Sequence, residues 1–213
     1  MFPKVIKTHS NHSGTILEAV KLGLFKKFSA PKARIELKFD EAVYDYTQKM
    51  TGKILVDPQE DIPVEGFRLE FGATKKVKWK KGFSSYNFSS SLDTKKIPVG
   101  SSTNLQRGQH YEQPFQVQIP FYTRPDPYTE IELKVKGVAA VKGRPDLTYE
   151  VKPGINFPYV IQCPAGQGGC GFTTEPLAIP VTACPRCGKN LEEIWERQIK
   201  YQAQQASQRS ERF

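Results

Sequence analysis

Residues 32–56 read KARIELKFDEAVYDYTQKMTGKILV, and this stretch decides the fold. Apolar side chains occupy every second position from Ile35 to Phe39, and charged side chains occupy the positions between them. A period of two residues is typical of a β-strand with one face in a core and the other in water. After a polar turn region, 52–56 forms a second apolar run that begins at Gly52. The stretch therefore predicts two successive strands.

The alternating pattern recurs along the following hundred residues, with turn residues such as Asp57-Pro58 and Lys81-Gly82 between its segments. The further predicted strands are 66–71, 75–80, 115–119, 131–141 and 148–151. We expect the Ser-rich stretch 83–104 to hold one or two weak strands around a mobile loop. Seven or more short strands with almost no helical periodicity between them favour a mainly β protein built on an antiparallel β-sandwich.

Several of these strands share a pattern with a known family. Tyr44 follows an apolar strand, Thr47 lies in the turn, and Gly52 opens the next strand. GFRLEFGATKKVKW at 66–79 and VKGVAAVKGRPDLTYEV at 135–151 continue the pattern. In LQRGQHYEQPFQVQIP at 105–120, the residues that fit it are Leu105, Gly108, His110, Pro114, Phe115, Ile119 and Pro120. Together these stretches resemble arrestin-like domains, which include a retromer subunit and bacterial sporulation-control proteins of the Spo0M type; the family's turn glycine is Thr47 here.

The resemblance covers about residues 24–153 and implies one immunoglobulin-like sandwich lobe. It also implies a non-catalytic scaffold that binds other proteins through sheet edges and loops, often near membranes. Arrestins proper have two lobes and a buried ion network between them that responds to a phosphorylated receptor. This sequence has one such lobe followed by cysteines, so that mechanism does not carry over to it.

The four cysteines all fall between 163 and 187. Cys184 and Cys187 have the C-x2-C spacing of a zinc knuckle, and Gly188 can take the left-handed conformation after its turn. Six residues separate Cys163 from Cys170, but three glycines in this gap permit a bulged loop. The pattern predicts a zinc ribbon that holds one structural Zn²⁺ on four thiolates. A disulfide arrangement and a redox pair are the alternatives.

Charge suggests where partners would bind. The net charge is +9, and in the predicted strand 75–80 alternation places Lys76, Lys78 and Lys80 on one face and Val77 and Trp79 on the other. These lysines are candidates for contact with an acidic or phosphorylated partner, or with lipid headgroups. Alternatively, they form a solvated face that discourages aggregation.

Residues 15–28 predict a short amphipathic helix with a capping box at Thr15 and Glu18. In one interpretation, its apolar stripe packs on its own domain. In the other, the helix lies on an anionic membrane or a partner, with Lys26 and Lys27 facing the negative charges.

A second helix is predicted after Asn190, which can cap it together with Glu193. Its apolar stripe comprises Leu191, Ile194, Trp195 and Ile199 and is expected to pack on the ribbon or the sandwich. Beyond residue 202 the polar tail is expected to fray, or to dock on a partner as a helix.

These patterns divide the chain into a leader and helix (1–28), a sandwich (29–153), a zinc ribbon (154–190), and a C-terminal helix with its tail (191–213). The sequence has no G-x-S-x-G, H-E-x-x-H or Gly-rich phosphate loop, and His110 is interpreted as structural. We therefore expect a non-catalytic adaptor with protein partners and no small-molecule substrate. The first residues show no secretory signal, and the sequence has no apolar run long enough to span a bilayer. We therefore expect a cytoplasmic protein, with peripheral membrane contact as a further hypothesis.

The alternative function is binding of nucleic acid by the ribbon, supported by the basic sandwich. Against it, residues 154–213 carry six Lys and Arg against five Asp and Glu, so the ribbon region is almost neutral. Phosphate binding needs local cations, and the sequence therefore favours a protein partner over a nucleic acid.

Overall fold

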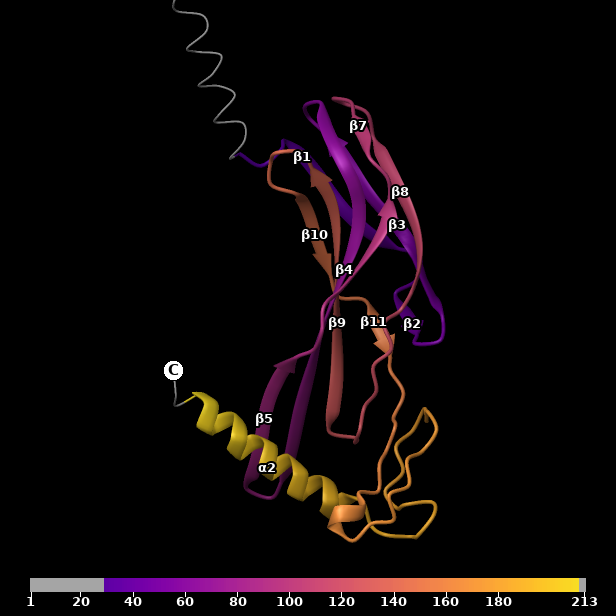
Figure 1. The fold of residues 1–213 in the computed structure, drawn as a ribbon, viewed down its shortest axis with the longest axis vertical. Coiled ribbons are helices and arrows are strands. Elements are labelled where there is room, and N and C mark those ends of the chain that lie inside the picture. The colour runs from indigo at the N-terminus through magenta and orange to yellow at the C-terminus, as the bar shows by residue number, and fades with distance from the viewer. Residues whose placement is uncertain (1–28, 211–213) are drawn as a thin grey trace, which may run out of the picture.

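A computed structural model describes residues 29–210 of the chain as a mainly β structure with one long C-terminal helix (Figure 1). The strands are β1 (Ala33–Phe39), β2 (Val43–Asp45), β3 (Lys49–Pro58), β4 (Ile62–Lys81), β5 (Ser84–Ser91), β6 (Lys95–Gly100), β7 (Thr103–Leu105), β8 (Tyr111–Gln118), β9 (Thr129–Val141), β10 (Leu147–Val151) and β11 (Gly154–Asn156). A 3₁₀ turn, η1 (Ala165–Gln167), and the helix α2 (Glu192–Ser210) follow. The helix expected at 15–28, with Lys26 and Lys27, lies outside the described residues.

Two sheets form the sandwich. The smaller sheet has the order β1-β3-β8, and the larger has the order β10-β9-β4-β5 with β6 and β7 also paired to β4. All these pairs are antiparallel, which confirms the predicted fold class. Apolar side chains from the two facing sheets, such as Leu37, Ile54, Phe71 and Val135, make one buried core. The core continues past β11 to Phe157, so the chain is still part of the sandwich there.

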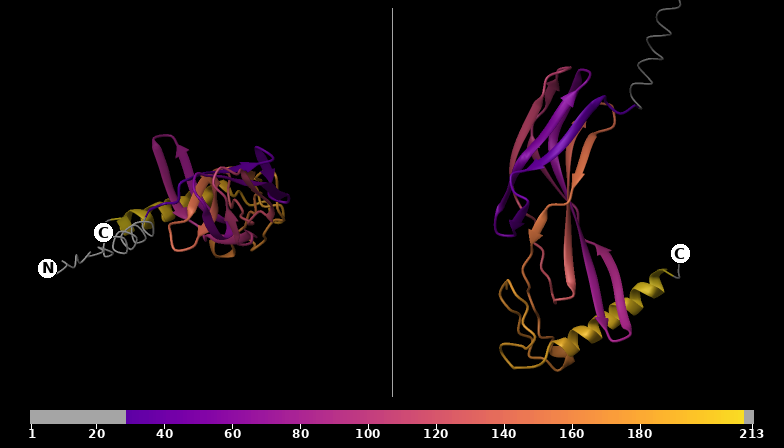
Figure 2. Two further views of the ribbon diagram at one scale, coloured as in Figure 1. Left: turned by 90° about the horizontal axis from the view of Figure 1, so that it is seen from above. Right: turned by 180° about the vertical axis from the view of Figure 1, so that it is seen from behind.

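Strand β4 is twenty residues long and joins two regions of the molecule. The sequence predicts separate strands at 66–71 and 75–80, and this division is wrong. Residues 72–74 stay extended because each of them pairs with a residue of β9. The part of β4 beyond the sandwich, 74–81, pairs with β5 and with 129–132 of β9. We call these three segments the extension; it projects from the sandwich in Figures 1 and 2.

The Ser-rich stretch is more ordered than expected. It contains β5, β6 and β7, all paired with β4, in place of one or two weak strands around a loop. Serine has little strand preference of its own, but pairing along a long, regular neighbour supplies the hydrogen bonds that hold these strands. Half-buried Tyr86 and Phe88 of β5 pack on Trp79 and Val77 of β4.

Helix α2 packs on the face of the extension that carries Val77 and Trp79, which we call the inner face. The Asn190 side chain accepts a hydrogen bond from the Glu192 backbone N–H at 2.9 Å, as the predicted cap requires. Ile199 is buried against Val77 and Trp79. The helix runs to Ser210, so the fraying expected beyond residue 202 is wrong for 203–210: this stretch is rich in Gln and Ala, which are good helix formers, and it continues across β5. None of the helices in the described part of the chain has the length and apolar character to cross a bilayer.

The turn between β1 and β3 is held from inside the core. Tyr44 is 1% exposed, and its hydroxyl donates to the Thr51 carbonyl oxygen at 2.8 Å and accepts from the Glu41 N–H at 3.2 Å. Gly52 lies next to this bond, and a Cβ there would overlap the Lys38 carbonyl oxygen and lie 2.8 Å from the Phe115 ring. The tyrosine and the glycine therefore fix how closely β1, β3 and β8 approach one another.

Gly52→Ala tests this close approach. We expect it to lower the free energy of unfolding by about 2 kcal/mol or more, because backbone atoms of β1 cannot yield to the added methyl group. Gly72→Ala is the matched control, since a Cβ at Gly72 would meet nothing within 4 Å; it should be neutral or slightly stabilising. Urea unfolding measures both, and equal effects of the two substitutions would contradict this account.

Candidate metal centre

Two knuckles carry the four cysteines, and the same pair of backbone hydrogen bonds closes each knuckle. In the second, the Gly188 N–H donates to the Cys184 carbonyl oxygen at 2.8 Å, and the Cys184 N–H donates to the Lys189 carbonyl oxygen at 2.9 Å. Gly188 has φ 70°, the left-handed conformation expected from the sequence.

The first knuckle repeats these bonds despite its longer loop. The Gly171 N–H donates to the Cys163 carbonyl oxygen at 2.8 Å, and the Cys163 N–H donates to the Phe172 carbonyl oxygen at 2.8 Å. The added residues form the turn η1. Gly169 passes so close to Cys163 that a Cβ would lie 2.6 Å from the sulfur, and the Cys170 N–H donates to that sulfur at 3.4 Å. The six-residue spacing is therefore an insertion that leaves the knuckle geometry intact.

The four sulfur atoms form a compact set. The Sγ atoms of Cys163 and Cys187 are 3.8 Å apart, those of Cys170 and Cys184 are 3.6 Å apart, and all four lie within 4.8 Å of one another. Four thiolates at about 2.3 Å from a central zinc, in a tetrahedron, would have sulfurs about 3.8 Å apart. A disulfide would instead bring two sulfurs to about 2.05 Å. The residues present fit one tetrahedral metal ion.

The sulfurs differ in their affinity for protons. The Cys170 amide lowers the pKa of the Cys163 thiol, but burial and the neighbouring thiols outweigh it and raise that pKa to about 11. Burial raises the pKa of the Cys184 thiol, whereas the amides of Cys187 and Arg186 lower it, with a net value of about 7. Without a metal, four thiolates would not coexist at neutral pH, so a bound cation must displace protons from this set.

The centre is part of a small core that leads into α2. Cys163 and Cys184 are each 2% exposed and pack with Ile161, Leu191 and Trp195. The half-buried residues that pack around this core are Tyr128, Tyr159, Phe172 and Val181. Tyr128 also contacts the core of the extension, which contains Ile199. The predicted stripe of the helix thus packs on the ribbon at its start and on the extension further along.

The predicted lysine face exists, but two of its members are paired. Lys76 bonds to Glu132 at 2.6 Å, and Lys78 lies 3.7 Å from Glu130. Ion pairing with Lys76 and with Lys152 lowers the pKa of the Glu132 carboxyl to about 2. Lys80 is exposed and has no ion pair among residues 29–210. Partner binding by these lysines stays a prediction.

His110 lies on the surface of the sandwich. Its ring is half exposed and lies 2.5 Å from Asp57 and 3.4 Å from Glu112, next to the start of β8. Both neighbours are surface carboxylates, so the side chain links β3 to β8, and its structural interpretation stays a prediction.

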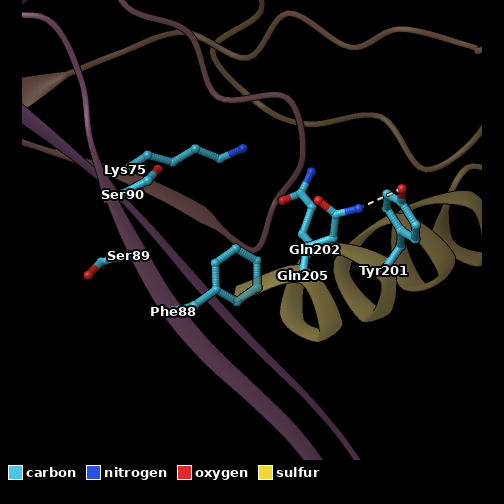
Figure 3. A pocket seen from close by; sticks show the side chains of 7 residues that line it. All are labelled: Lys75, Phe88, Ser89, Ser90, Tyr201, Gln202 and Gln205. Atoms are coloured by element: carbon cyan, nitrogen blue, oxygen red, sulfur yellow. Dashed lines mark hydrogen bonds between the residues drawn. The ribbon is translucent and has the colours of Figure 1, made fainter. Parts of the chain in front are cut away.

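Sequence reasoning missed one feature, an open groove of about 410 Å³ between the extension and α2 (Figure 3). It is lined by Lys75, Phe88, Ser89, Ser90, Tyr201, Gln202 and Gln205. The Tyr201 ring is 62% exposed, and its hydroxyl accepts from the Gln205 side chain at 2.7 Å. No motif marks this groove, because it requires the tail to stay helical and β5 to form.

Comparisons with known proteins concern the fold. No family model matches the chain, and no curated protein matches it. Among solved structures, the chain is similar to the sporulation control protein Spo0M from Bacillus subtilis, at 14% sequence identity and a TM-score of 0.44. The matched region is 60% of this chain and 50% of Spo0M, so the chain spans half the length of that protein.

Cys184→Ser tests the metal centre. We expect the wild-type protein to hold one metal ion per chain by elemental analysis and the variant to lose nearly all of it, because three thiolates and a hydroxyl bind zinc far more weakly. Glu175→Ser, an exposed change in the same region, should keep the metal. A wild-type chain purified without metal under reducing, chelator-free conditions, or a fully loaded Cys184→Ser variant, would contradict the assignment.

Proposed function

We propose that this protein is a non-catalytic adaptor that binds other proteins, with a zinc ribbon that serves its structure. The observation that carries the proposal is the continuous strand β4, which joins the sandwich and the extension and pairs with β9 without a register shift from Gly66 to Val77. A rigid connection of this kind holds two separate surfaces at a fixed spacing, which suits a scaffold.

The chemistry of the described residues supports the same proposal. The four cysteines complete a tetrahedral ligand set, so a zinc ion held there would have no position for water or substrate. Two thiols are buried and two are exposed at the surface. Four thiolates in this geometry suit zinc or iron, and we propose zinc because four cysteines in two knuckles are typical of structural zinc sites. When bound, it would hold the two knuckles together.

Nucleic-acid binding is the second candidate, and the charges offer it less support. Lys76, Lys78 and Lys81 each lie beside a glutamate, at 2.6 to 3.7 Å. Cations already paired with carboxylates attract phosphate less strongly. Binding of RNA or DNA that weakens steeply with salt would favour this candidate over the adaptor.

The adaptor proposal is tested by crosslinking in native lysate, followed by purification of the full-length protein and identification of partners by mass spectrometry. We expect specific protein partners, with crosslinks to the sandwich or the extension, that remain after nuclease treatment. Loss of all partners after nuclease treatment, or no crosslinked protein above a matched control bait, would contradict the proposal.

A further inference from the structure

The free edge of β5 differs from the other sheet edges in residues 29–210. β5 pairs with β4 from Ser84 to Ser91 in a regular register, and it is the last strand of its sheet. Its sequence, SSYNFSSS, has no charged residue and no proline. The other edge strands longer than three residues, β1, β6, β8 and β10, each carry at least one charged residue or proline. Such residues normally protect a free edge from pairing, and β5 lacks this protection.

A groove lies beside this unprotected edge. Phe88 and Ser90 of β5 line one side of it, and Tyr201 and Gln205 of α2 line the other (Figure 3). In a strand added to β5, every second side chain would point to this inner face. The groove has an aromatic ring on each side, which suits an apolar or aromatic side chain between them.

The charges beside the edge favour an acidic partner. Lys75 lines the groove, and no ion pair to it is formed within the described part of the chain. On the outer face, Lys80 lies opposite Ser85 of β5, is exposed, and has no ion pair among residues 29–210. Lys78 lies opposite Asn87 and is also exposed, although Glu130 at 3.7 Å offsets part of its charge. An added strand would lie two strand spacings from them, about 10 Å away. This distance is about one Debye length in physiological salt, so the lysines attract acidic residues weakly and in a salt-dependent manner.

We propose that the β5 edge binds an extended acidic peptide segment of a partner protein by strand addition, with alternate apolar side chains in the groove beside Phe88 and Tyr201. This inference rests on the proposed adaptor function and names the class of partner that it would bind. Backbone hydrogen bonds to β5 provide the pairing, the groove selects an apolar side chain, and the lysines select acidic neighbours.

The test uses full-length, metal-loaded protein and a fluorescein-labelled eight-residue peptide that alternates glutamate with valine and has one valine replaced by phenylalanine. We expect saturable binding by fluorescence anisotropy, with slower hydrogen exchange at 84–91. The matched peptides carry N-methyl groups at every second residue, in each of the two frames. Strand addition predicts that one frame abolishes binding and the other does not, because only one edge of the peptide faces β5.

Protein variants test the groove and the charges separately. Tyr201→Ala should weaken binding about tenfold, whereas Tyr149→Ala, a half-exposed tyrosine of β10, should not change it. Lys78→Glu with Lys80→Glu should weaken it at least about threefold. The control pair, Lys49→Glu with Lys142→Glu, makes the same charge change at exposed positions of the sandwich and should have a much smaller effect.

Several results would overturn the inference. One is absence of saturable peptide binding; another is equal loss of binding with both N-methyl frames. A third is exchange protection, in the free protein, of those β5 amides that point away from β4, which would mean that another segment of the chain or a second copy already covers the edge. Binding to anionic vesicles through exposed Phe83 and the lysines, without peptide binding, would assign this region to lipid instead. The peptide assay needs no native partner. If it fails while lysate crosslinks show protein partners at another surface, the strand-addition inference is overturned and the adaptor proposal remains.

Discussion

The apolar inner face of β4 is the constraint on which the rest of the structure depends. The strand has buried side chains at alternate positions from Phe67 to Trp79, apart from Lys75, and this face is longer than the opposing sheet β1-β3-β8 can cover. The sandwich covers it as far as Ala73, whereas Val77 and Trp79 lie in a separate core with Ile199 of α2. The C-terminal helix therefore completes the burial that the second sheet begins, and it does so from a part of the chain more than one hundred residues away.

The ribbon determines where that helix begins. Leu191, directly before α2, and Trp195, in its first turn, share a core with Cys163 and Cys184. This core is small, and in such a region metal binding contributes most of the folding free energy, on the order of 10 kcal/mol. The sandwich, in contrast, has a large apolar core of its own. The metal is therefore expected to control the position of α2, and through it the groove and the β5 edge, while the sandwich stays folded without it.

Much of this arrangement follows from local sequence patterns. The alternation in 32–56 predicts β1 and β3, the cysteine spacing predicts the ligand set, and the apolar stripe predicts the buried face of α2. The patterns fail where long-range pairing decides the outcome. The alternating pattern divides 66–80 into two strands, but pairing with β9 keeps β4 continuous through Gly72, and pairing with β4 orders the Ser-rich β5. The ion pairs of Lys76 and Lys78 depend on glutamates of β9 more than fifty residues away, which no local pattern shows.

The dependence of the extension on the metal can be measured directly by hydrogen exchange of the full-length protein with metal bound and after removal of the metal by a chelator under reducing conditions. The account predicts that amide protection falls in α2 and in 74–91 when the metal is removed, because the cover over Val77 and Trp79 loses its anchor. It also predicts that protection of β1, β3 and β8 is unchanged. Equal protection of α2 and the extension in both states would contradict the account, as would loss of protection throughout the sandwich.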